Sequence, residues 1–384
     1  MPDDVLTLDG TVRARSPEET WAVLKPLLRR YGITRVARLT GLDHLGLPVW
    51  TAIRPAAKTL VATQGKGATD LLAKTSAVME AIELWHVEQP RTVELRAAAA
   101  DIDLPYPLAA LPVKVSGEAL TGAEKVQLEW MYGTGLISGR QVPVPLGLVR
   151  RHGCRPLWEP DLFRATSTGL ACGTTRPEAL LHALYEVVER DALFADEIKG
   201  GTHRQLIDPA SVDDPYCRTL LDRLRQAGVA VEIAAVDNAY AVPVCLAFVW
   251  CEDYPAAVFA GSGCHGTPHI ALSRAITEAV QSRLTSIAGT RDDLPSHHDA
   301  TTGPPRFTSS PGPHMPWPAW AADAAPLRFA ASFPKQSARV ARRIHQVTGH
   351  EPIRLILSAA DDRVAAVKVI CPGARSRIRK AVPR

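Results

Sequence analysis

The sequence lacks several features that would assign it to a membrane, to secretion or to nucleic acid. No uninterrupted apolar run approaches the roughly 20 residues that a transmembrane helix needs. The opening residues 1–5 carry neither a basic lead nor an apolar stretch, so we expect no signal peptide. The formal net charge of +4 at pH 7 is too small to argue for a nucleic-acid partner. We therefore expect a cytoplasmic protein that binds neither membranes nor nucleic acid.

The cysteines also lack the spacing patterns that would indicate a structural role. The 7 cysteines are an odd number and contain no Cys-x-x-Cys pair, which argues against a disulfide framework and a structural zinc site. Cys172 and Cys264 lie inside glycine-rich segments, where packing explains them better than nucleophilic chemistry. Hydrophobic residues make up 46% and charged residues 22% of the 384 positions, as in ordinary globular enzymes.

The sequence does contain one residue pattern that occurs three times. Each copy has an alanine, a second alanine four residues later, Glu three residues after that, and Glu or Gln a further three residues on. The copies are Ala73-Ala77-Glu80-Glu83, Ala179-Ala183-Glu186-Glu189 and Ala271-Ala275-Glu278-Gln281, preceded by the glycine-bearing segments 65–67, 169–173 and 261–266. This spacing places the four residues of each copy on one face of a helix.

The acids of these predicted helices stand among apolar residues, where an uncompensated carboxylate is costly. Several converging carboxylates suit magnesium, which usually also binds substrate phosphates. Glycine segments that lead into helix N-termini offer backbone N–H groups to an anion. The pattern therefore predicts a magnesium–nucleotide site built from three glycine-loop-to-helix units. An internal duplication with only structural meaning would not explain why acids were kept in apolar helices.

The remaining pattern predicts an α+β fold with helices covering mixed, largely antiparallel sheets. Helices are expected over about 71–87, 177–198, 216–226, 268–287 and 336–348. Strands are expected near 33–39, 48–53, 59–63, 126–132, 135–137, 141–144, 229–236, 242–250, 256–260, 353–358 and 364–371. We expect a single domain over 1–384, with a proline-rich flexible loop at 292–320 and a basic tail at 372–384. The loop is either a substrate lid or disordered.

Three stretches of the sequence together form a specific signature. They are Gly65-Lys66-Gly67 with Ser76-x-x-x-Glu80-x-x-Glu83; Ser167-x-Gly169-x-Ala171-x-Gly173 with Glu178-Ala179 and Glu186-x-x-Glu189-Arg190-Asp191; and Glu278-x-x-Gln281-x-Arg283. With these motifs the chain resembles the YcaO family of ATP-dependent enzymes that modify peptide backbones. The resemblance spans nearly the whole chain, whereas each motif alone is weak.

The resemblance implies a YcaO-like fold, ATP and Mg²⁺ as cofactors, and a mechanism. ATP phosphorylates the oxygen of a peptide amide whose carbon is attacked by a nucleophile, and loss of phosphate leaves a thioamide, an azoline or an amidine. The residues that match the family's magnesium ligands are Glu80, Glu83, Glu186 and Glu189. Those that match its nucleotide and phosphate contacts are Lys66, Ser76, Glu178, Arg190, Glu278, Gln281 and Arg283.

Two residues depart from the family pattern. Leu84 follows Glu83 where the family has arginine, and Thr174 stands where asparagine is expected. Both departures leave the metal acids intact, so they bear on nucleotide affinity more than on catalysis. A partly degenerate member that binds nucleotide without turnover is one alternative. A nucleic-acid-binding protein that uses the arginine-rich segment 339–384 is another, and it would bind in a salt-dependent way that is indifferent to Glu186.

The type of product is indicated by the two ends of the chain. Azoline-forming members often end in a proline-rich tail, whereas residues 380–384 contain one proline. Segments 34–37 and 52–55 look closer to the branch that works beside a TfuA-type partner to install thioamides. There an external sulfide is the nucleophile, so no catalytic cysteine is required. We therefore favour thioamide over azoline formation on a peptide or protein substrate, by a homodimer with a TfuA-like partner. The residues do not identify the peptide, the sulfur donor or a general base.

Overall fold

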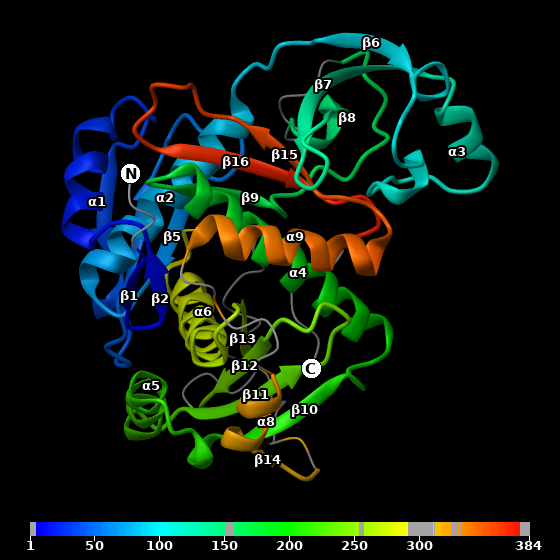
Figure 1. The fold of residues 1–384 in the computed structure, drawn as a ribbon. Helices are drawn as coiled ribbons and strands as arrows, with labels where there is room; N and C mark the ends of the chain where they lie inside the picture. The colour runs from blue at the N-terminus through cyan, green and yellow to red at the C-terminus, as the bar shows by residue number, and fades with distance from the viewer. Residues whose placement is uncertain are drawn as a thin grey trace.

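Three long helices each follow a strand and pack back against it. The computed structural model describes residues 5–150, 157–252, 257–290, 310, 312–324, 329 and 332–376 (Figure 1). The three units are β5 (Ala62–Lys66) with α2 (Asp70–Glu88), β9 (Leu170–Gly173) with α4 (Arg176–Ile198), and β13 (Phe259–Cys264) with α6 (Pro268–Ala288). Thr69 and Thr175 cap their helices by accepting the N–H of the third helical residue. These elements confirm the three helices that the repeats predict. The glycine-bearing segments that were expected as loops are largely strands, because Gly65, Gly173 and Gly261 lie in β5, β9 and β13.

The strands of these units belong to sheets that are mostly antiparallel. The six-stranded sheet runs β6-β7-β15-β16-β9, with β8 on β7, and its further strands are β6 (Leu95–Ala98), β7 (Gln127–Gly135), β8 (Gln141–Pro145), β15 (Ile353–Ile356) and β16 (Ala365–Ile370). The five-stranded sheet runs β13-β12-β11-β10-β14, with β10 (Arg204–Asp208), β11 (Ala230–Val236), β12 (Val244–Trp250) and β14 (Met315–Pro316). Smaller sheets join β3 (Arg35–Arg38) and β4 (Val49–Ile53) to β5, and β1 (Leu6–Leu8) to β2 (Thr11–Arg13). Among the described strands only β10 and β14 pair in parallel, so the predicted α+β class is confirmed.

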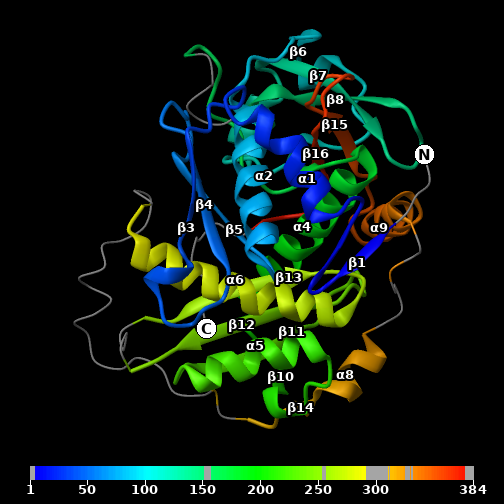
Figure 2. The ribbon, with the colours of Figure 1, turned by 90° about the vertical axis from the view of Figure 1, so that its left-hand side faces the viewer.

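Helices lie between and beside the two larger sheets. In Figure 1, α4 and α9 (Phe333–Thr348) cross the middle, with β9, β15 and β16 above them and β10 to β13 below. Figure 2 shows α2 between the β3-β4-β5 sheet and α1 (Pro17–Leu24), and α5 (Pro215–Gln226) near α6; both helices pack against the five-stranded sheet. A short α3 (Glu118–Ala123) lies in the part of the molecule that carries β6 to β8. This arrangement brings the three repeat helices around one interior region.

In each unit the strand packs so closely on its helix that the two backbones are nearly in contact. The alanines of the repeats that face the strands are fully buried; they are Ala73, Ala77, Ala179, Ala183, Ala271 and Ala275. A Cβ atom placed on Gly65 would overlap the backbone of Ala73 and Ala77, and one on Gly261 would overlap the backbone of Ala275. Only glycine on the strand and alanine on the helix permit this approach. The small residues of the repeats therefore set the distance between each strand and its helix.

The structure corrects some predicted boundaries. The predicted strand 126–132 continues to Gly135 as β7, so residues 136 and 137 of the strand expected at 135–137 lie outside it, and the strand expected at 256–260 begins only at Phe259. The predicted flexible loop 292–320 is wrong at its end, because Met315 and Pro316 form β14 and α8 (Trp317–Asp323) follows with Trp317 and Trp320 buried. The earlier part of that loop, 292–309, and the tail residues 377–384 lie outside the described residues. The single-domain assignment stays a prediction.

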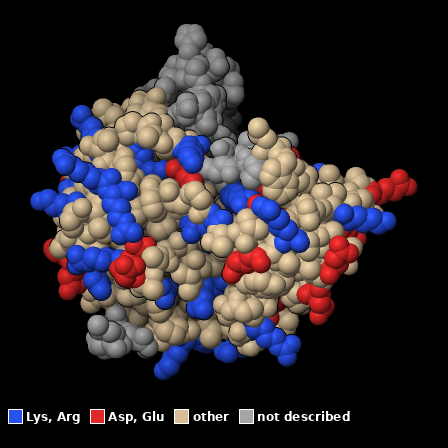
Figure 3. Space-filling model, turned by 90° about the horizontal axis from the view of Figure 1, so that it is seen from above, with Lys and Arg blue, Asp and Glu red and all other residues tan. Residues whose placement is uncertain are grey.

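The surface carries charges of both signs. On the face shown in Figure 3, lysine and arginine are interspersed with aspartate and glutamate over the described surface. This mixture differs from the one-signed stripe typical of proteins that bind nucleic acid. Among the described helices, none combines the length and apolar character that a bilayer span requires.

The contact between Gly65 and α2 leads to a prediction about stability. Gly65→Ala forces a methyl group into the helix backbone, so we expect the free energy of unfolding to fall by about 3 kcal/mol, the upper end for overpacking. Gly122→Ala is the matched control, because a Cβ there meets no atom within 4 Å. Urea unfolding of both variants checks this. Equal midpoints for Gly65→Ala and the parent would show that the close approach does not limit stability.

Candidate functional site

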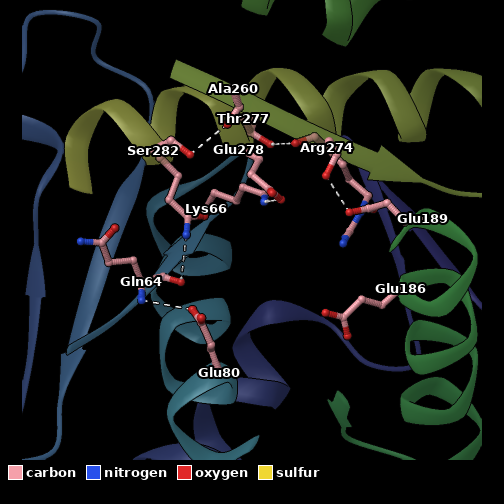
Figure 4. Close-up of polar contacts among 12 residues, drawn as sticks. Gln64, Lys66, Glu80, Glu186, Glu189, Ala260, Arg274, Thr277, Glu278 and Ser282 are labelled. Carbon is pink, nitrogen blue, oxygen red and sulfur yellow. Dashed lines mark hydrogen bonds and ion pairs between the residues drawn. The ribbon is translucent and has the colours of Figure 1, made fainter. Parts of the chain in front are cut away.

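Acidic side chains from the three repeat helices point toward one interior region. Figure 4 shows Glu80 on α2, Glu186 and Glu189 on α4, and Glu278 on α6 directed into this region. Glu83 lies one turn after Glu80 on α2, and both of these residues are half-buried. The structure thus brings together all four predicted magnesium ligands and one predicted nucleotide contact. The alanine and glycine contacts that seat the helices also fix where these acids stand.

Each acid is held by a polar group from a glycine-bearing strand. Glu80 accepts the N–H of Gln64 at 3.2 Å and Glu186 that of Gly169 at 3.2 Å, each within its own unit. Two bonds cross between units. Glu83 accepts the N–H of Cys172 at 2.8 Å, and Glu189 accepts the hydroxyl of Ser262 at 2.7 Å. These bonds hold the acids in place although they repel one another.

A third contact connects the first repeat unit to the third. Lys66 Nζ lies 2.5 Å from Glu278 Oε2, which joins the first unit to the third (Figure 4). Gln281 donates its Nε2 hydrogen to the carbonyl of Gln64 at 3.4 Å across the same boundary. The three units are therefore connected pairwise through the residues that the motifs single out, and the site is one structure rather than three.

The acids carry more negative charge than their protein neighbours neutralise. Burial raises the pKa of Glu83 well above its usual range, and the charges of Glu80 and Glu186 add to this. Burial also raises the pKa of Glu186 to about 7; Arg190 opposes the rise and Glu189 adds to it. Carboxyl groups in this state favour a bound cation, because a cation removes both the repulsion and the need for protons.

The donor set fits magnesium that is bound together with phosphate. Within the described residues, no three His, Cys, Asp or Glu side chains converge closely enough to hold one ion by themselves. Magnesium usually takes one or two carboxylates and completes its shell with water and substrate phosphate oxygens. The spaced acids are therefore suited to metal ions that arrive with a polyphosphate rather than to a protein-only cage.

Most of the predicted nucleotide contacts border the acids. Arg190 Nη2 lies 3.7 Å from Glu186 Oε1. Burial by itself lowers the pKa of Arg190, but the surrounding carboxylates, led by Glu186, raise it above its usual value. Ser76 is half-buried on α2, one turn before Glu80. Lys66 and Arg190 thus supply positive charge on two sides of the acidic region.

Glu178 has a different environment from the other acids. Its Oε2 accepts both the N–H and the hydroxyl of Thr174 at 2.9 Å, and its Oε1 accepts the N–H of Ala14 at 3.4 Å. The residue is 2% exposed and stands in the first turn of α4. In the structure Glu178 therefore fixes the start of α4 to the N-terminal segment. Thr174, which departs from the family pattern, provides two of these bonds, and a nucleotide role for Glu178 stays a prediction.

Arg283 does not join the acids. Its Nε and Nη2 donate to the two carboxylate oxygens of Asp43 at 2.7 and 3.2 Å, and its Nη1 lies 2.7 Å from Cys251 Sγ. The side chain is 2% exposed. This buried ion pair ties α6 to the segment after β3, which favours a structural role for Arg283. Its predicted phosphate contact has no support in this geometry.

The sequence motifs did not identify four basic residues that lie beside the acids. They are Arg13, His182, His265 and Arg274. Arg274 lies one turn before Glu278 on α6 and points into the same region (Figure 4). His182 lies one turn before Glu186 on α4. The spacing of four residues from a predicted ligand was the signal available for both, whereas nothing in the sequence connects Arg13 to α4.

Comparison with known proteins gives the site its family context. The family model described as YcaO cyclodehydratase, ATP- and Mg²⁺-binding, matches residues 64–375. An uncharacterized protein of Mycobacterium tuberculosis is 37% identical over 388 residues, which cover 97% of this chain and 84% of the relative. An uncharacterized protein in the tfuA 3′ region of Rhizobium leguminosarum bv. trifolii is 39% identical over 301 residues, 73% of this chain and 69% of the relative.

A solved structure supports the same fold. The structure of YcaO from Methanopyrus kandleri bound with AMPPCP and Mg²⁺ matches with a TM-score of 0.71, covering 100% of both chains at 21% identity. The family-model match begins within β5 and ends beyond β16, so it includes the helices of all three repeat units. The chain belongs to the YcaO family of ATP- and Mg²⁺-binding cyclodehydratases.

Proposed function

We propose that this protein uses ATP and Mg²⁺ to phosphorylate the oxygen of a peptide backbone amide, and that it makes a thioamide beside a TfuA-type partner. The observation that carries the proposal is the set of acids from α2 and α4, held by glycine-bearing strands and bordered by Lys66 and Arg190. Phosphoryl transfer mainly requires positioned phosphates and neutralised charge, which such a set provides. The family description as ATP- and Mg²⁺-binding agrees with it.

The acidic and the basic residues of the site would have different roles. Magnesium would be held by Glu80, Glu83, Glu186 and Glu189 and would neutralise the charge of the phosphates. The guanidinium of Arg190 presents a fork that suits phosphate oxygens. Lys66 is already paired with Glu278, so a phosphate that approaches Lys66 shares or replaces that carboxylate. Transfer of the phosphoryl group to the amide releases ADP, and sulfide attack followed by loss of phosphate leaves C=S in place of C=O.

The cysteines agree with an external sulfur nucleophile. Cys172 and Cys264 lie closest in sequence to the glycine motifs, and both are buried. Burial raises the pKa of each thiol well above its usual value, with smaller contributions from Glu83 at Cys172 and from Glu189 at Cys264. Both are therefore held as unreactive thiols rather than thiolates. The relative in the tfuA 3′ region supports a TfuA-type partner, and a homodimer and a cytoplasmic location stay predictions from the family.

A second candidate function is azoline formation. The family model is described as a cyclodehydratase, and this activity uses the same phosphorylated amide with a side chain of the peptide as nucleophile. The two reactions differ in the product rather than in the nucleotide site. A scaffold that binds nucleotide without turnover would differ from both in forming no product.

The role of the acids in binding magnesium can be tested by calorimetric titration of ATP with and without Mg²⁺. We expect Glu186→Gln and Glu189→Gln to weaken Mg²⁺-dependent ATP binding by about 100-fold or more, since even indirect partners of a metal contribute 10- to 100-fold. Glu197→Gln, near the end of α4, is the control and should bind like the parent. Parent-like affinity in both acid variants would remove the basis for this site.

The raised pKa of Glu186 predicts that ligand binding releases protons. With a pKa of about 7 the carboxyl group is about half protonated at pH 7 in the ligand-free protein, and a metal–nucleotide complex displaces that proton. Binding should therefore weaken as pH falls from 8 to 6, and titrations at about pH 7 in buffers of different ionisation enthalpy should show proton release. The release should be lost in Glu186→Gln. Because the folded-state pKa lies above the usual 4.5, the ligand-free protein should also lose stability as pH rises from 4.5 toward 7.

The product can be identified from proteins of cells that express either the parent or Glu186→Gln. Thioamide formation replaces oxygen by sulfur and raises the peptide mass, whereas azoline formation removes water and lowers it. We expect a mass increase that is present only with the parent chain. A mass decrease would establish the azoline alternative, and identical peptide masses in the two cultures would contradict both reactions.

A further inference from the structure

A buried lysine lies on β16, the strand that pairs with β9 (Figure 1). Lys368 is only 2% exposed. Its neighbours on the same face of the strand, Ala366 and Ile370, belong to a hydrophobic core. Burial of an ammonium group costs free energy that burial of an apolar side chain does not. A lysine at this position therefore needs a compensating contact.

The ammonium group of Lys368 holds the turn that leads into β9. Its Nζ donates to the carbonyl oxygens of Thr166 at 2.7 Å and of Thr168 at 2.9 Å. Within the turn, the N–H of Thr168 donates to Thr166 Oγ1 at 3.3 Å. The N–H of Leu170 donates to the carbonyl of Ser167 at 2.8 Å. Two carbonyl groups therefore point at one cation, which fixes the path of the backbone between them.

Gly169 follows this turn directly and holds Glu186. Its N–H donates to Glu186 at 3.2 Å, and its carbonyl accepts the N–H of Val369 at 2.7 Å. The φ angle of Gly169 is +77°, in the left-handed region, and an added Cβ would overlap the carbonyl oxygen of Val369. Strand β16 thus fixes the backbone on both sides of Gly169, by the Lys368 ammonium group before it and by strand pairing after it. The N–H group that Glu186 accepts is placed by these contacts.

The charge of Lys368 also acts on Glu186 through space. Burial raises the pKa of Glu186, and the charges of Arg190 and Lys368 oppose that rise. The other charged groups that face this carboxylate are acids, namely Glu189 on the same helix and Glu83 on α2. Arg190 belongs to α4 itself, whereas Lys368 brings positive charge from the sheet. Lys368 therefore supports Glu186 both through the turn and by its charge.

We propose that Lys368 is a positioning residue for the magnesium site. It fixes the turn at 166–168, so that the N–H of Gly169 holds Glu186 in the place from which this carboxylate would bind the metal ion. This inference rests on the proposed nucleotide function. Lys368 acts only through Gly169 and Glu186, as an indirect partner of a metal ligand does. Loss of its ammonium group should therefore weaken the binding of magnesium rather than the contacts of the protein with the nucleotide.

The test measures ATP binding by calorimetry at rising Mg²⁺ concentration in two variants of Lys368. Lys368→Met keeps the length of the side chain but removes its charge and its donors. We expect half-maximal ATP affinity to need about 10-fold more Mg²⁺, because indirect partners of a metal contribute about 10- to 100-fold. Excess Mg²⁺ should then restore the affinity of the parent by mass action. Lys368→Gln, which keeps a donor without the charge, should raise the Mg²⁺ requirement in the same direction.

Two control substitutions separate this effect from damage to the strand. Ile370→Val removes a methyl group from the same buried face of β16 without changing the turn, so it should leave the Mg²⁺ requirement unchanged. Lys335→Met removes an exposed lysine on α9 and should bind ATP and Mg²⁺ like the parent. Thermal unfolding shows whether each variant is folded.

Several results would overturn the role of Lys368. It is wrong if both Lys368 variants need the same Mg²⁺ concentration as the parent, or if their affinity for ATP stays low in excess Mg²⁺. It is also wrong if neither variant folds, because Lys368 would then serve the fold alone. Each of these results leaves the proposed function intact, whereas a parent chain that binds no ATP even with Mg²⁺ would contradict the proposed function itself.

Discussion

The close contact between glycine-bearing strands and alanine-bearing helices is the constraint on which the rest of this structure depends. Gly65 and Gly261 leave no room for a Cβ atom between the strand and the helix backbone, and the facing alanines are fully buried. At this separation, backbone N–H groups of the strand can donate hydrogen bonds to the acids on the helix. Gln64, which precedes Gly65, donates to Glu80 across this contact, and Gly169, just before β9, donates to Glu186. Small residues therefore provide the precision of the site.

The three units also depend on one another. Glu83 bonds to β9 and Glu189 to β13, while Lys66 pairs with Glu278 on α6. A buried carboxylate held by one neutral donor is still poorly compensated, and the raised pKa values of Glu83 and Glu186 reflect this. The fold thus carries a concentration of negative charge that favours a cation, and the cation is of use to the chemistry only if phosphate accompanies it.

Some basic groups pair with the acids, as Arg190 does with Glu186 and Lys66 with Glu278, whereas others stand one turn away on the same helices. On α4 the order is Glu178, His182, Glu186 and Glu189, one stripe that begins with a helix-terminal bond and ends with the acids. On α6 Arg274 precedes Glu278. Arg283, by contrast, is paired with Asp43 and serves to join α6 to the segment after β3.

The sequence by itself determined the three repeat helices and the face of each that carries alanines and the predicted metal acids, because helical spacing is local and is visible in the order of residues. Only the structure showed that the glycine-bearing segments are largely strands that pack on those alanines. It also predicted the α+β class and the largely antiparallel sheets. Only the tertiary structure decided that Glu83 and Glu189 bond to neighbouring units, that Arg283 is taken by Asp43, and that Arg13 lies on His182. The physical reason is that these contacts join residues far apart in the chain, and their partners depend on how the units pack.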